Sequence, residues 1–375
     1  MINIQMGELP NNLKYVCRRQ NVMSRFRVGL IGCGVISPMH LESIKRLSGL
    51  ELVAVCDLKE DRLKKTAEKY DCQGYTDFQE LIAQEHPDVV HICTPHYLHA
   101  PIAIYAANKG INILTEKPMA ITRSDAEEMI SAARRNRVKL GVIFQNRYNP
   151  GSLLIKKTLD SGELGRVLSA RFSVIWNRGL EYYQKSDWRG KWKTEGGGVL
   201  INQAIHTLDL ARWFIDSPVS YVESQFSNRC HPGIEVEDTV EGIIFHENNV
   251  RTNFYLTTNY GYNVPVEIEL YCEQGIAKMT KDQAVIHLTN GRKYDTNQGK
   301  NNNLDYGGGA KNYWGVSHYQ QISDYYRALE EDRDPTINGE EGLKTQTLVC
   351  AIYQSGKEQK RVYLEECKQQ VLIAK

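Results

Sequence analysis

Short runs of apolar, often β-branched residues alternate with amphipathic segments from residue 26 to about residue 145. Strands of a parallel sheet that is buried on both faces are almost continuously apolar, and helices connect them. The pattern therefore predicts successive βα units around such a sheet. The expected strands are RVGLIG (27–32), ELVAVCD (51–57), VVHICTP (89–95), INILTEKP (111–118) and KLGVIFQ (139–145); the expected helices cover about 38–48, 59–70, 97–109 and 124–137, with Thr122 or Ser124 as the cap of the last one.

The pattern changes after about residue 146. A helix is expected at 150–160 and a strand at 166–176, followed by a loop rich in Tyr, Trp and Arg and by a helix that opens at Gly196-Gly197-Gly198. Between residues 219 and 288, runs such as TVEGIIFH, VRTNFYLTT and VEIELYC predict a mostly antiparallel sheet. The remaining expected features are a long loop at 290–313 and helices at about 316–331 and 340–359.

The length of 375 residues favours two domains, because single cores rarely grow beyond roughly 250–300 residues. Residues 1–24 precede the first strand and are expected to form an N-terminal extension, either a disordered tail or residues upstream of a start at Met23. They lack the apolar segment of a signal peptide, and no stretch in the chain approaches the ~18 apolar residues of a membrane span.

Charge and cysteine content exclude several classes of partner. The 46 basic and 45 acidic side chains nearly cancel and form no block of five like charges, so neither a nucleic acid nor a membrane is expected as a partner. A small molecule is the expected substrate. The nine cysteines include no C-x-x-C pair and often lie within apolar runs, which is typical of buried free thiols in a reducing cytoplasm.

A glycine-rich turn follows the first expected strand and opens the first helix, at Gly32-Cys33-Gly34-Val35-Ile36-Ser37. This is the context of a dinucleotide-binding fingerprint, in which the first glycine permits a tight turn and the second lets a pyrophosphate approach backbone amides. Asp57 ends the second strand 23 residues after Gly34, near the ~20 expected for the acid that binds a ribose hydroxyl. The ordinary role of such a residue is to cap the following helix, and the two roles can coexist.

A carboxylate at the end of the second strand repels a 2′-phosphate, so NAD is the expected cofactor. Lys59 and Arg62 follow closely and could accommodate that phosphate, so NADP is the alternative.

Two further segments carry reactive side chains. Lys117 lies in Glu116-Lys117-Pro118 at a strand end, and Asn202, His206 and Asp209 are expected on one face of a helix. Oxidation of an alcohol needs one group to polarise the oxygen and one to move its proton, and a lysine and a histidine can do both. Each residue alone has a more ordinary interpretation, namely a surface turn for Lys117, a core histidine for His206 and a structural carboxylate for Asp209.

Six short motifs follow one another along the chain: G-C-G-x-I-S-x-x-H (32–40), C-T-P-x-x-x-H (93–99), E-K-P (116–118), W-R (188–189), G-G-G (196–198) and N-x-x-x-H-x-x-D (202–209). In this order they resemble the glucose–fructose oxidoreductase/inositol dehydrogenase/MocA oxidoreductases, from about residue 26 to the end. The resemblance implies an α/β fold with a Rossmann NAD(P)-binding domain at 25–146 and a C-terminal α/β domain at 147–375. The second domain would carry a mostly antiparallel open sheet that joins subunits into a homodimer or homotetramer, and its last helices could pack back on the Rossmann domain.

The resemblance also implies roles for single residues. Lys117, after a cis Lys–Pro bond, would reach the substrate hydroxyl and the nicotinamide ribose, and His206 would be the general acid/base. The common family pattern has aspartate four residues before this histidine, whereas this chain has Asn202. Asparagine can orient the imidazole but cannot offset its charge. Either Asp209 takes over as the partner of His206, or Lys117 carries more of the proton transfer.

The loop at 176–193 combines aromatic and basic side chains that could stack on a sugar or hold a carboxylate or phosphate. By resemblance Trp188 and Arg189 approach the nicotinamide end and the substrate, while Arg147 and Tyr148 should line the cleft between the domains. No metal site is expected, because His91, His96 and His99 lack a metal-binding pattern. The full expected cofactor set is Gly32, Gly34, Val35, Ile36, Asp57, Thr94, Pro95, His96, His99, Glu116, Lys117, Trp188 and Arg189; the expected substrate set is Arg147, Tyr148, Tyr183, Trp188, Arg189 and His206.

These features predict an NAD(P)-dependent oxidoreductase that transfers hydride between nicotinamide and a carbinol carbon of a sugar, a cyclitol or a nucleotide-linked sugar. The N-Q-x-I-H form of the helix is similar to that of enzymes acting on nucleotide-activated sugars, such as UDP-N-acetylglucosaminuronate 3-dehydrogenases. Two alternatives stay open: a glycosidase that uses NAD for transient oxidation, and a non-catalytic NAD-binding sensor.

Overall fold

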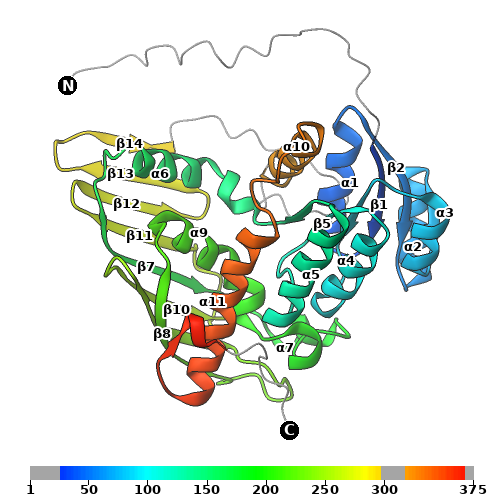
Figure 1. The fold of residues 1–375 in the computed structure, drawn as a ribbon. Helices are drawn as coiled ribbons and strands as arrows, with labels where there is room; N and C mark the ends of the chain where they lie inside the picture. Colours follow the sequence, from blue (N-terminus) through cyan, green and yellow to red (C-terminus); the bar gives the residue numbers. More distant parts are fainter. Residues whose placement is uncertain (1–25, 297–316, 368–375) are drawn as a thin grey trace.

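The structure is a computed structural model that describes residues 26–296 and 317–367 (Figure 1). The N-terminal extension expected at 1–24 lies outside the described residues, as does most of the loop expected at 290–313. The described residues form two sheets with helices packed between and around them (Figure 1). None of the described helices combines the length and hydrophobicity that crossing a membrane requires.

The first sheet has six parallel strands in the order β3-β2-β1-β4-β5-β6, which is the order of doubly wound dinucleotide-binding folds. The five strands expected from the sequence are present. No sequence pattern indicated β3, because this strand has three residues and none of them is fully buried. The elements are β1 (Phe26–Ile31), α1 (Ser37–Arg46), β2 (Leu50–Cys56), α2 (Glu60–Tyr70), β3 (Gln73–Tyr75), α3 (Phe78–Glu85), β4 (Val89–Ile92), α4 (His99–Asn108), β5 (Asn112–Thr115), α5 (Arg123–Asn136) and β6 (Leu140–Val142). Thr122 caps α5 by accepting the Asp125 N–H.

The second sheet has nine strands in the order β14-β13-β12-β11-β7-β10-β9-β8-β15. Only β7 and β10 pair in parallel, so the expectation of a mostly antiparallel sheet is confirmed. Its strands are β7 (Val167–Ile175), β8 (Val219–Ser227), β9 (Thr239–His246), β10 (Arg251–Thr257), β11 (Glu267–Cys272), β12 (Gly275–Thr280), β13 (Gln283–Leu288), β14 (Lys293–Asp295) and β15 (Val362–Tyr363).

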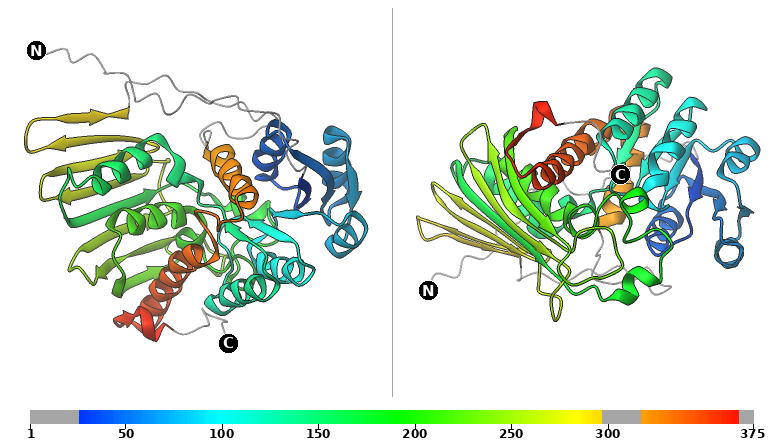
Figure 2. Two further views of the ribbon diagram at one scale, coloured as in Figure 1. Left: turned by 45° about the horizontal axis from the view of Figure 1, so that its top comes forward. Right: turned by 90° about the horizontal axis from the view of Figure 1, so that it is seen from below.

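Three helices cover one face of the second sheet, namely α6 (Pro150–Asp160), α9 (Ile205–Ile215) and α11 (Gly339–Glu358), and Figure 2 shows the opposite face without a helix. The remaining long helix, α10 (Ser317–Glu330), packs against α1 of the first sheet. A single apolar cluster includes Ile92 from the first sheet and Ile286 from the second, so one continuous core joins the two halves. The short helices are η2 (His96–Leu98), η3 (Gln145–Tyr148), α7 (Leu180–Gln184), α8 (Trp192–Glu195), the π-helix η4 (Val199–Ala204) and η7 (Leu364–Glu366).

The triple glycine lies at the crowded junction between α8 and η4. A Cβ at Gly197 would lie 2.0 Å from the Tyr353 hydroxyl, and one at Gly198 would lie 1.9 Å from the Glu237 carbonyl oxygen. Gly197 also has a φ of +144°, which side chains rarely adopt. The run is therefore needed for the close approach of η4 to β9 and α11, and this approach fixes where η4 and α9 begin.

Candidate active site

The glycine turn after β1 separates a glycine that the fold needs from one that it does not. Gly32 has a φ of +100°, and a Cβ there would lie 2.6 Å from the Cys93 carbonyl. A Cβ at Gly34 would find no atom nearer than Arg62, at 3.8 Å. The packing of the chain therefore requires glycine at position 32. At position 34 it does not, and the absence of a side chain there leaves open space beside the turn.

Helix α1 begins directly after this turn with no side-chain cap, and Val35 is 66% exposed. The first N–H groups of a helix lack intrahelical partners, and an uncapped N-terminus next to open space fits a phosphate group. The turn thus has the backbone and the room that a dinucleotide pyrophosphate requires.

Asp57 connects the end of β2 to the glycine turn. Its carboxylate accepts the Cys33 N–H at 2.9 Å and the Lys59 N–H at 2.8 Å. The alternative role as a helix cap is wrong, because α2 follows Lys59 and has no side-chain cap. The Arg62 guanidinium lies 3.7 Å from Asp57, while Lys59 pairs with Asp187 at 2.5 Å.

Two histidines after β4 bind the neighbouring backbone. The His99 ring nitrogens lie 2.7 Å from the Pro118 carbonyl oxygen and 2.8 Å from that of Thr94, so His99 connects the turn after β4 to the Lys117–Pro118 segment, whose peptide bond is cis. His96 Nδ1 lies 2.7 Å from the Glu195 carbonyl oxygen. Burial lowers the pKa of both rings. The polar atoms of His99 are therefore used within the protein rather than offered to a cofactor.

Lys117 reaches across to the second half of the chain. Its Nζ donates to the Asn202 carbonyl at 2.8 Å and lies 3.4 Å from Asn202 Oδ1. Burial lowers the pKa of Lys117 to about 8, against the opposing charge of Glu116. The E-K-P turn and the helix that carries His206, which the sequence separates by some eighty residues, are thus brought together.

Glu116 was expected to contact the cofactor, and this expectation is wrong. Its carboxylate turns into the interior, where one oxygen lies 3.1 Å from His40 Nε2 and 3.4 Å from His318 Nε2 and the other accepts the Lys117 N–H at 3.2 Å. Burial favours the protonated form, but the neighbouring His318 ring and the hydrogen bond from His40 outweigh it and hold the pKa of Glu116 well below its usual range. Glu116 is therefore a buried counter-charge beneath Lys117.

A chain of buried groups continues from Glu116, and the sequence patterns did not reveal it. His40 Nδ1 lies 2.9 Å from His91 Nδ1, and His91 Nε2 lies 2.8 Å from the Tyr326 hydroxyl. If His40 donates to Glu116, its other nitrogen must accept from His91, which in turn accepts from Tyr326. His318 and Tyr326 come from α10, more than 200 residues after Glu116, so no local spacing could have indicated the cluster.

His206 lacks the partner that the sequence led us to expect. Its Nδ1 is buried without a hydrogen bond to any described residue. The Asn202 amide instead donates to Glu195 at 2.6 Å and to the Tyr182 hydroxyl at 3.2 Å. The expectation that Asn202 orients the imidazole is therefore wrong. Asn202 lies in the π-helix η4 and His206 in the following helix α9, so the two residues do not share one continuous α-helix as predicted.

The electrostatic surroundings keep His206 neutral. Burial lowers its pKa to about 3, and the nearby charge of Lys117 acts in the same direction. His206 is thus an uncharged imidazole beside a lysine that titrates near neutral pH.

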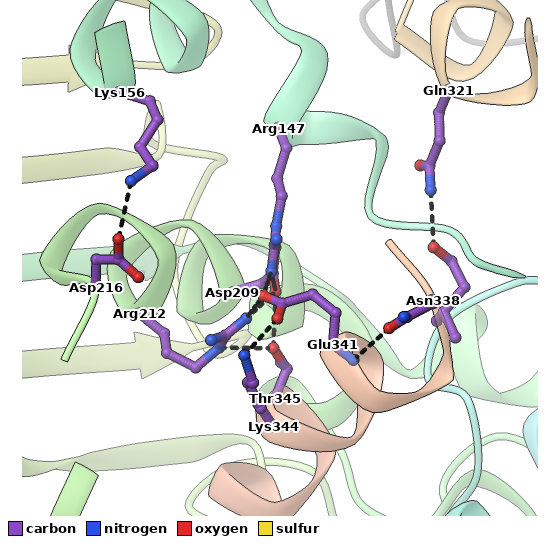
Figure 3. Close-up of polar contacts among 11 residues, drawn as sticks. Arg147, Lys156, Asp209, Arg212, Asp216, Gln321, Asn338, Glu341, Lys344 and Thr345 are labelled. Carbon is purple, nitrogen blue, oxygen red and sulfur yellow. Dashed lines mark hydrogen bonds and ion pairs between the residues drawn. The ribbon is translucent and has the colours of Figure 1, made fainter. Parts of the chain in front are cut away.

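Asp209 does not partner His206. Its two oxygens accept from the Arg147 guanidinium, each at 2.6 Å, and one also accepts from Thr345 Oγ1 at 2.7 Å (Figure 3). The expectation that Arg147 lines a substrate cleft is wrong for the same reason, since Arg147 is buried and also pairs with Glu341 at 2.9 Å. Burial raises the pKa of Asp209, but the charge and hydrogen bonds of Arg147 outweigh it, so the pKa is lowered. This ion pair connects η3, α9 and α11.

Two expected substrate tyrosines are also engaged elsewhere. The Tyr148 hydroxyl donates to Asp324 of α10 at 2.9 Å. Tyr183 is buried, with its hydroxyl 3.5 Å from Thr258. Both expectations are corrected, because tertiary packing, which the loop sequence does not reveal, decides which tyrosine faces the site.

The tyrosine that meets the site residues is Tyr182. Its hydroxyl accepts from Asn202 Nδ2 and, at 3.1 Å, from Gln203 Nε2, and no described residue accepts its proton. Arg189 stacks over Tyr182 at 4.4 Å and over Trp188 at 4.9 Å, and its Nε is buried without a partner among the described residues. Thr94 Oγ1 is likewise unpartnered there. Unpartnered buried polar atoms are uncommon; of these two residues, Thr94 adjoins Gly32 of the glycine turn, and Arg189 lies close enough to Lys117 to lower its pKa.

Comparisons with known proteins match both halves of the chain to one family. Residues 26–144 match the model of the GFO/IDH/MocA oxidoreductases with an NAD-binding Rossmann fold, and residues 153–278 match the GFO/IDH/MocA C-terminal domain. An inositol 2-dehydrogenase of Rubrobacter xylanophilus is 30% identical, covering 65% of this chain and 69% of that protein. A D-glucoside 3-dehydrogenase of Escherichia coli is 28% identical, covering 91% and 98%.

Among solved structures, the WlbA dehydrogenase of Bordetella pertussis in complex with NADH and UDP-GlcNAcA superposes with a TM-score of 0.78. It is 29% identical, and the match covers 90% of this chain and 98% of that one.

The open space at Gly34 predicts the effect of filling it. Gly34→Ala should leave the melting temperature nearly unchanged, because the added Cβ meets no atom within 3.8 Å, yet weaken NAD binding at least about tenfold. Isothermal titration calorimetry of the folded variant measures the affinity. Unchanged affinity would contradict placing the pyrophosphate at this turn.

The buried Arg147–Asp209 pair predicts a pH-dependent loss of stability. Asp209→Asn should lower the free energy of unfolding by about 3 kcal/mol at pH 7, because it leaves the Arg147 charge poorly paired. The folded-state pKa of Asp209 lies below its ordinary value of 3.8, so the advantage of the carboxylate is complete above that value and disappears as the pH falls through the folded-state pKa.

Urea denaturation over a series of pH values measures this effect. The exposed pair Lys156–Asp160 supplies a control, since Asp160→Asn should cost no more than about 0.5 kcal/mol. Equal costs for the two substitutions would overturn the assignment of Asp209 as the central structural carboxylate.

Proposed function

This chain belongs to the GFO/IDH/MocA oxidoreductase family, and from that premise we propose that it is an NAD-dependent dehydrogenase of secondary hydroxyl groups on sugars, cyclitols or nucleotide-linked sugars. The observation that carries the proposal is the meeting of Lys117 with the segment that holds His206, beside an uncapped helix N-terminus. A lysine of lowered pKa and a neutral imidazole in one site are suited to moving the proton of a hydroxyl group.

The residues present fit a dinucleotide. The N–H groups after Gly34 would hold the pyrophosphate, and the Asp57 carboxylate, which has acceptor capacity beyond its two backbone bonds, would hold a ribose hydroxyl. Thr94 and Trp188 would lie near the nicotinamide end. NAD supplies the hydride acceptor. The pairing of Lys59 with Asp187 supports NAD over NADP, because it leaves Arg62 as the one nearby cation of the two that the sequence suggested.

Lys117 carries the proton transfer in this proposal. Its pKa of about 8 is close to the working pH, which is the condition for an efficient acid or base. His206 has a pKa of about 3 and no carboxylate partner, so it would orient the hydroxyl through a hydrogen bond rather than store the proton. Of the two consequences that Asn202 left open, the contacts of Asp209 support the one in which Lys117 does more.

The substrate class that we favour is a nucleotide-linked sugar. The N-Q-x-I-H segment and the stacked Tyr182, Trp188 and Arg189 support it, as does the likeness to the WlbA dehydrogenase, whose structure holds UDP-GlcNAcA. Arginine can hold a phosphate or carboxylate bidentately, and aromatic faces can pack on sugar rings.

We also propose a homodimer or homotetramer formed through the open face of the second sheet, where Tyr255, Tyr271 and Ile276 are exposed. None of the described cysteines is paired in a disulfide, which supports a reducing cytoplasm as the location.

A thermal-shift screen of sugars, inositols and UDP- or dTDP-sugars, with NAD present, tests the substrate class. A ligand that binds the folded state raises the melting temperature by mass action, so we expect hits among the nucleotide sugars. Hits confined to free sugars or inositols would contradict this choice, and a screen without any hit would count against the site itself.

Lys117→Met tests the reaction. The variant should lose at least about 100-fold in kcat while it still binds NAD, because the substitution removes the acid/base group and leaves the glycine turn intact. In the unaltered protein, oxidation should become faster as the pH rises through about 8, where Lys117 becomes a neutral amine. NADH absorbance measures both effects. Retained turnover in the variant would contradict the role of Lys117 in proton transfer. Release of an aglycone without net formation of NADH would identify a glycosidase instead.

A further inference from the structure

Glu195 is a fully buried carboxylate that none of the sequence motifs includes. It ends α8, directly before the triple glycine. One oxygen accepts the Gly190 N–H at 2.6 Å, and the other accepts Asn202 Nδ2 at 2.6 Å. Its own carbonyl oxygen lies 2.7 Å from His96 Nδ1, which holds the end of α8 against the Rossmann half. Both oxygens are thus fixed, by donors that carry no charge.

The orientation of the Asn202 amide follows from its two neighbours. An ammonium can only donate a hydrogen bond and a carboxylate can only accept one, so Oδ1 must face Lys117 and Nδ2 must face Glu195. The backbone carbonyl of Asn202 also accepts a hydrogen bond from Lys117 Nζ, at 2.8 Å. Asn202 therefore bridges Lys117 and Glu195.

We propose, on the basis of the function proposed above, that Glu195 is a positioning residue for Lys117 and acts through Asn202. Glu195 holds the Asn202 amide with Oδ1 toward Lys117 Nζ. It also supplies a negative charge, through the intervening Asn202 side chain, where an aspartate at position 202 would supply that charge directly. A glutamine at 195 could present its amide NH2 group to Asn202, and this donor would compete with Lys117 for the Asn202 Oδ1.

The charges around Lys117 set the size of the effect. Glu116 and Glu195 raise its pKa and Arg189 lowers it. The other titratable groups around Lys117 are the His96, His99, His206 and His318 rings and the Tyr182 hydroxyl. Burial raises the pKa of Glu195 to about 7, against the hydrogen bonds from Gly190 and Asn202. The charge of Glu195 therefore changes close to the pH range in which Lys117 titrates.

Glu237 provides a matched control within the same segment. It is also buried, and burial raises its pKa to about 7. Its carboxylate accepts from the Gly198 N–H at 2.7 Å, the Leu200 N–H at 3.1 Å and the Tyr353 hydroxyl at 2.9 Å, so it supports η4 without touching Asn202 or Lys117. A purely structural role for Glu195 would make the two carboxylates equivalent in effect.

The test compares Glu195→Gln with Glu237→Gln in the full chain. The pKa of Lys117, followed by ¹⁵N NMR of the lysine side chains without NAD and assigned with Lys117→Met, should fall by about 1 unit in Glu195→Gln and stay in place in Glu237→Gln. The pH profile of kcat should move by the same amount. An unchanged Lys117 pKa in Glu195→Gln would overturn the proposal. Absence of turnover in the unaltered protein would count against the proposed function alone, because the titration needs no substrate.

A charge swap gives a second test that does not depend on Glu195→Gln folding alone. Asn202→Asp should impair activity, since it places two carboxylates in hydrogen-bond contact. Combined with Glu195→Gln, it restores one carboxylate paired with one amide, so kcat/KM of the double variant should exceed that of either single variant. The Lys117 pKa should then be at or above its original value. A double variant no better than the worse single variant, or one with a lower Lys117 pKa, would refute the proposal.

Discussion

The structure depends on accommodating the amine of Lys117 between the two sheets. A lysine in such a position is stable only if opposite charge and hydrogen-bond acceptors surround it. Glu116 supplies the charge from beneath, held by His40 and His318, and the Asn202 carbonyl supplies the acceptor from above. The charge and the acceptor come from opposite halves of the chain, so the site is complete only when the two halves are packed together.

Rigid supports hold the second half in register with the first. The glycine run lets η4 approach the Glu237 carbonyl and Tyr353, where no side chain would fit. The Arg147–Asp209 pair then connects η3 to α9 and α11. Because such pairs need near-ideal geometry to repay their desolvation, they position backbone segments more than they add stability. Their effect is to present Asn202 and His206 to Lys117 with little freedom.

The sequence predicted the parts of the fold and site that depend on local pattern. Apolar runs located five of the six Rossmann strands, and the glycine turn located the uncapped start of α1, to which Asp57 is hydrogen-bonded through the Cys33 N–H. The sequence-based prediction failed where interacting residues lie far apart in the sequence and where a helix is not a regular α-helix. The spacing predicted that Asp209 lies next to His206, yet its carboxylate is hydrogen-bonded to Arg147 of η3. Asn202 lies in a π-helix, for which α-helical spacing does not hold. Glu195 could have been noticed as a charged residue directly before a run of glycine and apolar residues.

The chain from Tyr326 through His91 and His40 to Glu116 has a consequence for how the site responds to acid. With Glu116 ionised, a neutral His40 donates to it and accepts from His91, and His91 accepts from Tyr326, so these groups form one directed series of hydrogen bonds. The pKa of Glu116 lies well below its usual range, so Glu116 stays charged near neutral pH, while Glu195, with a pKa of about 7, gains and loses its charge there. Lys117 thus lies between Glu116, whose charge is constant near neutral pH, and Glu195, whose charge changes with pH. Glu195 is the carboxylate on the side of the aromatic loop.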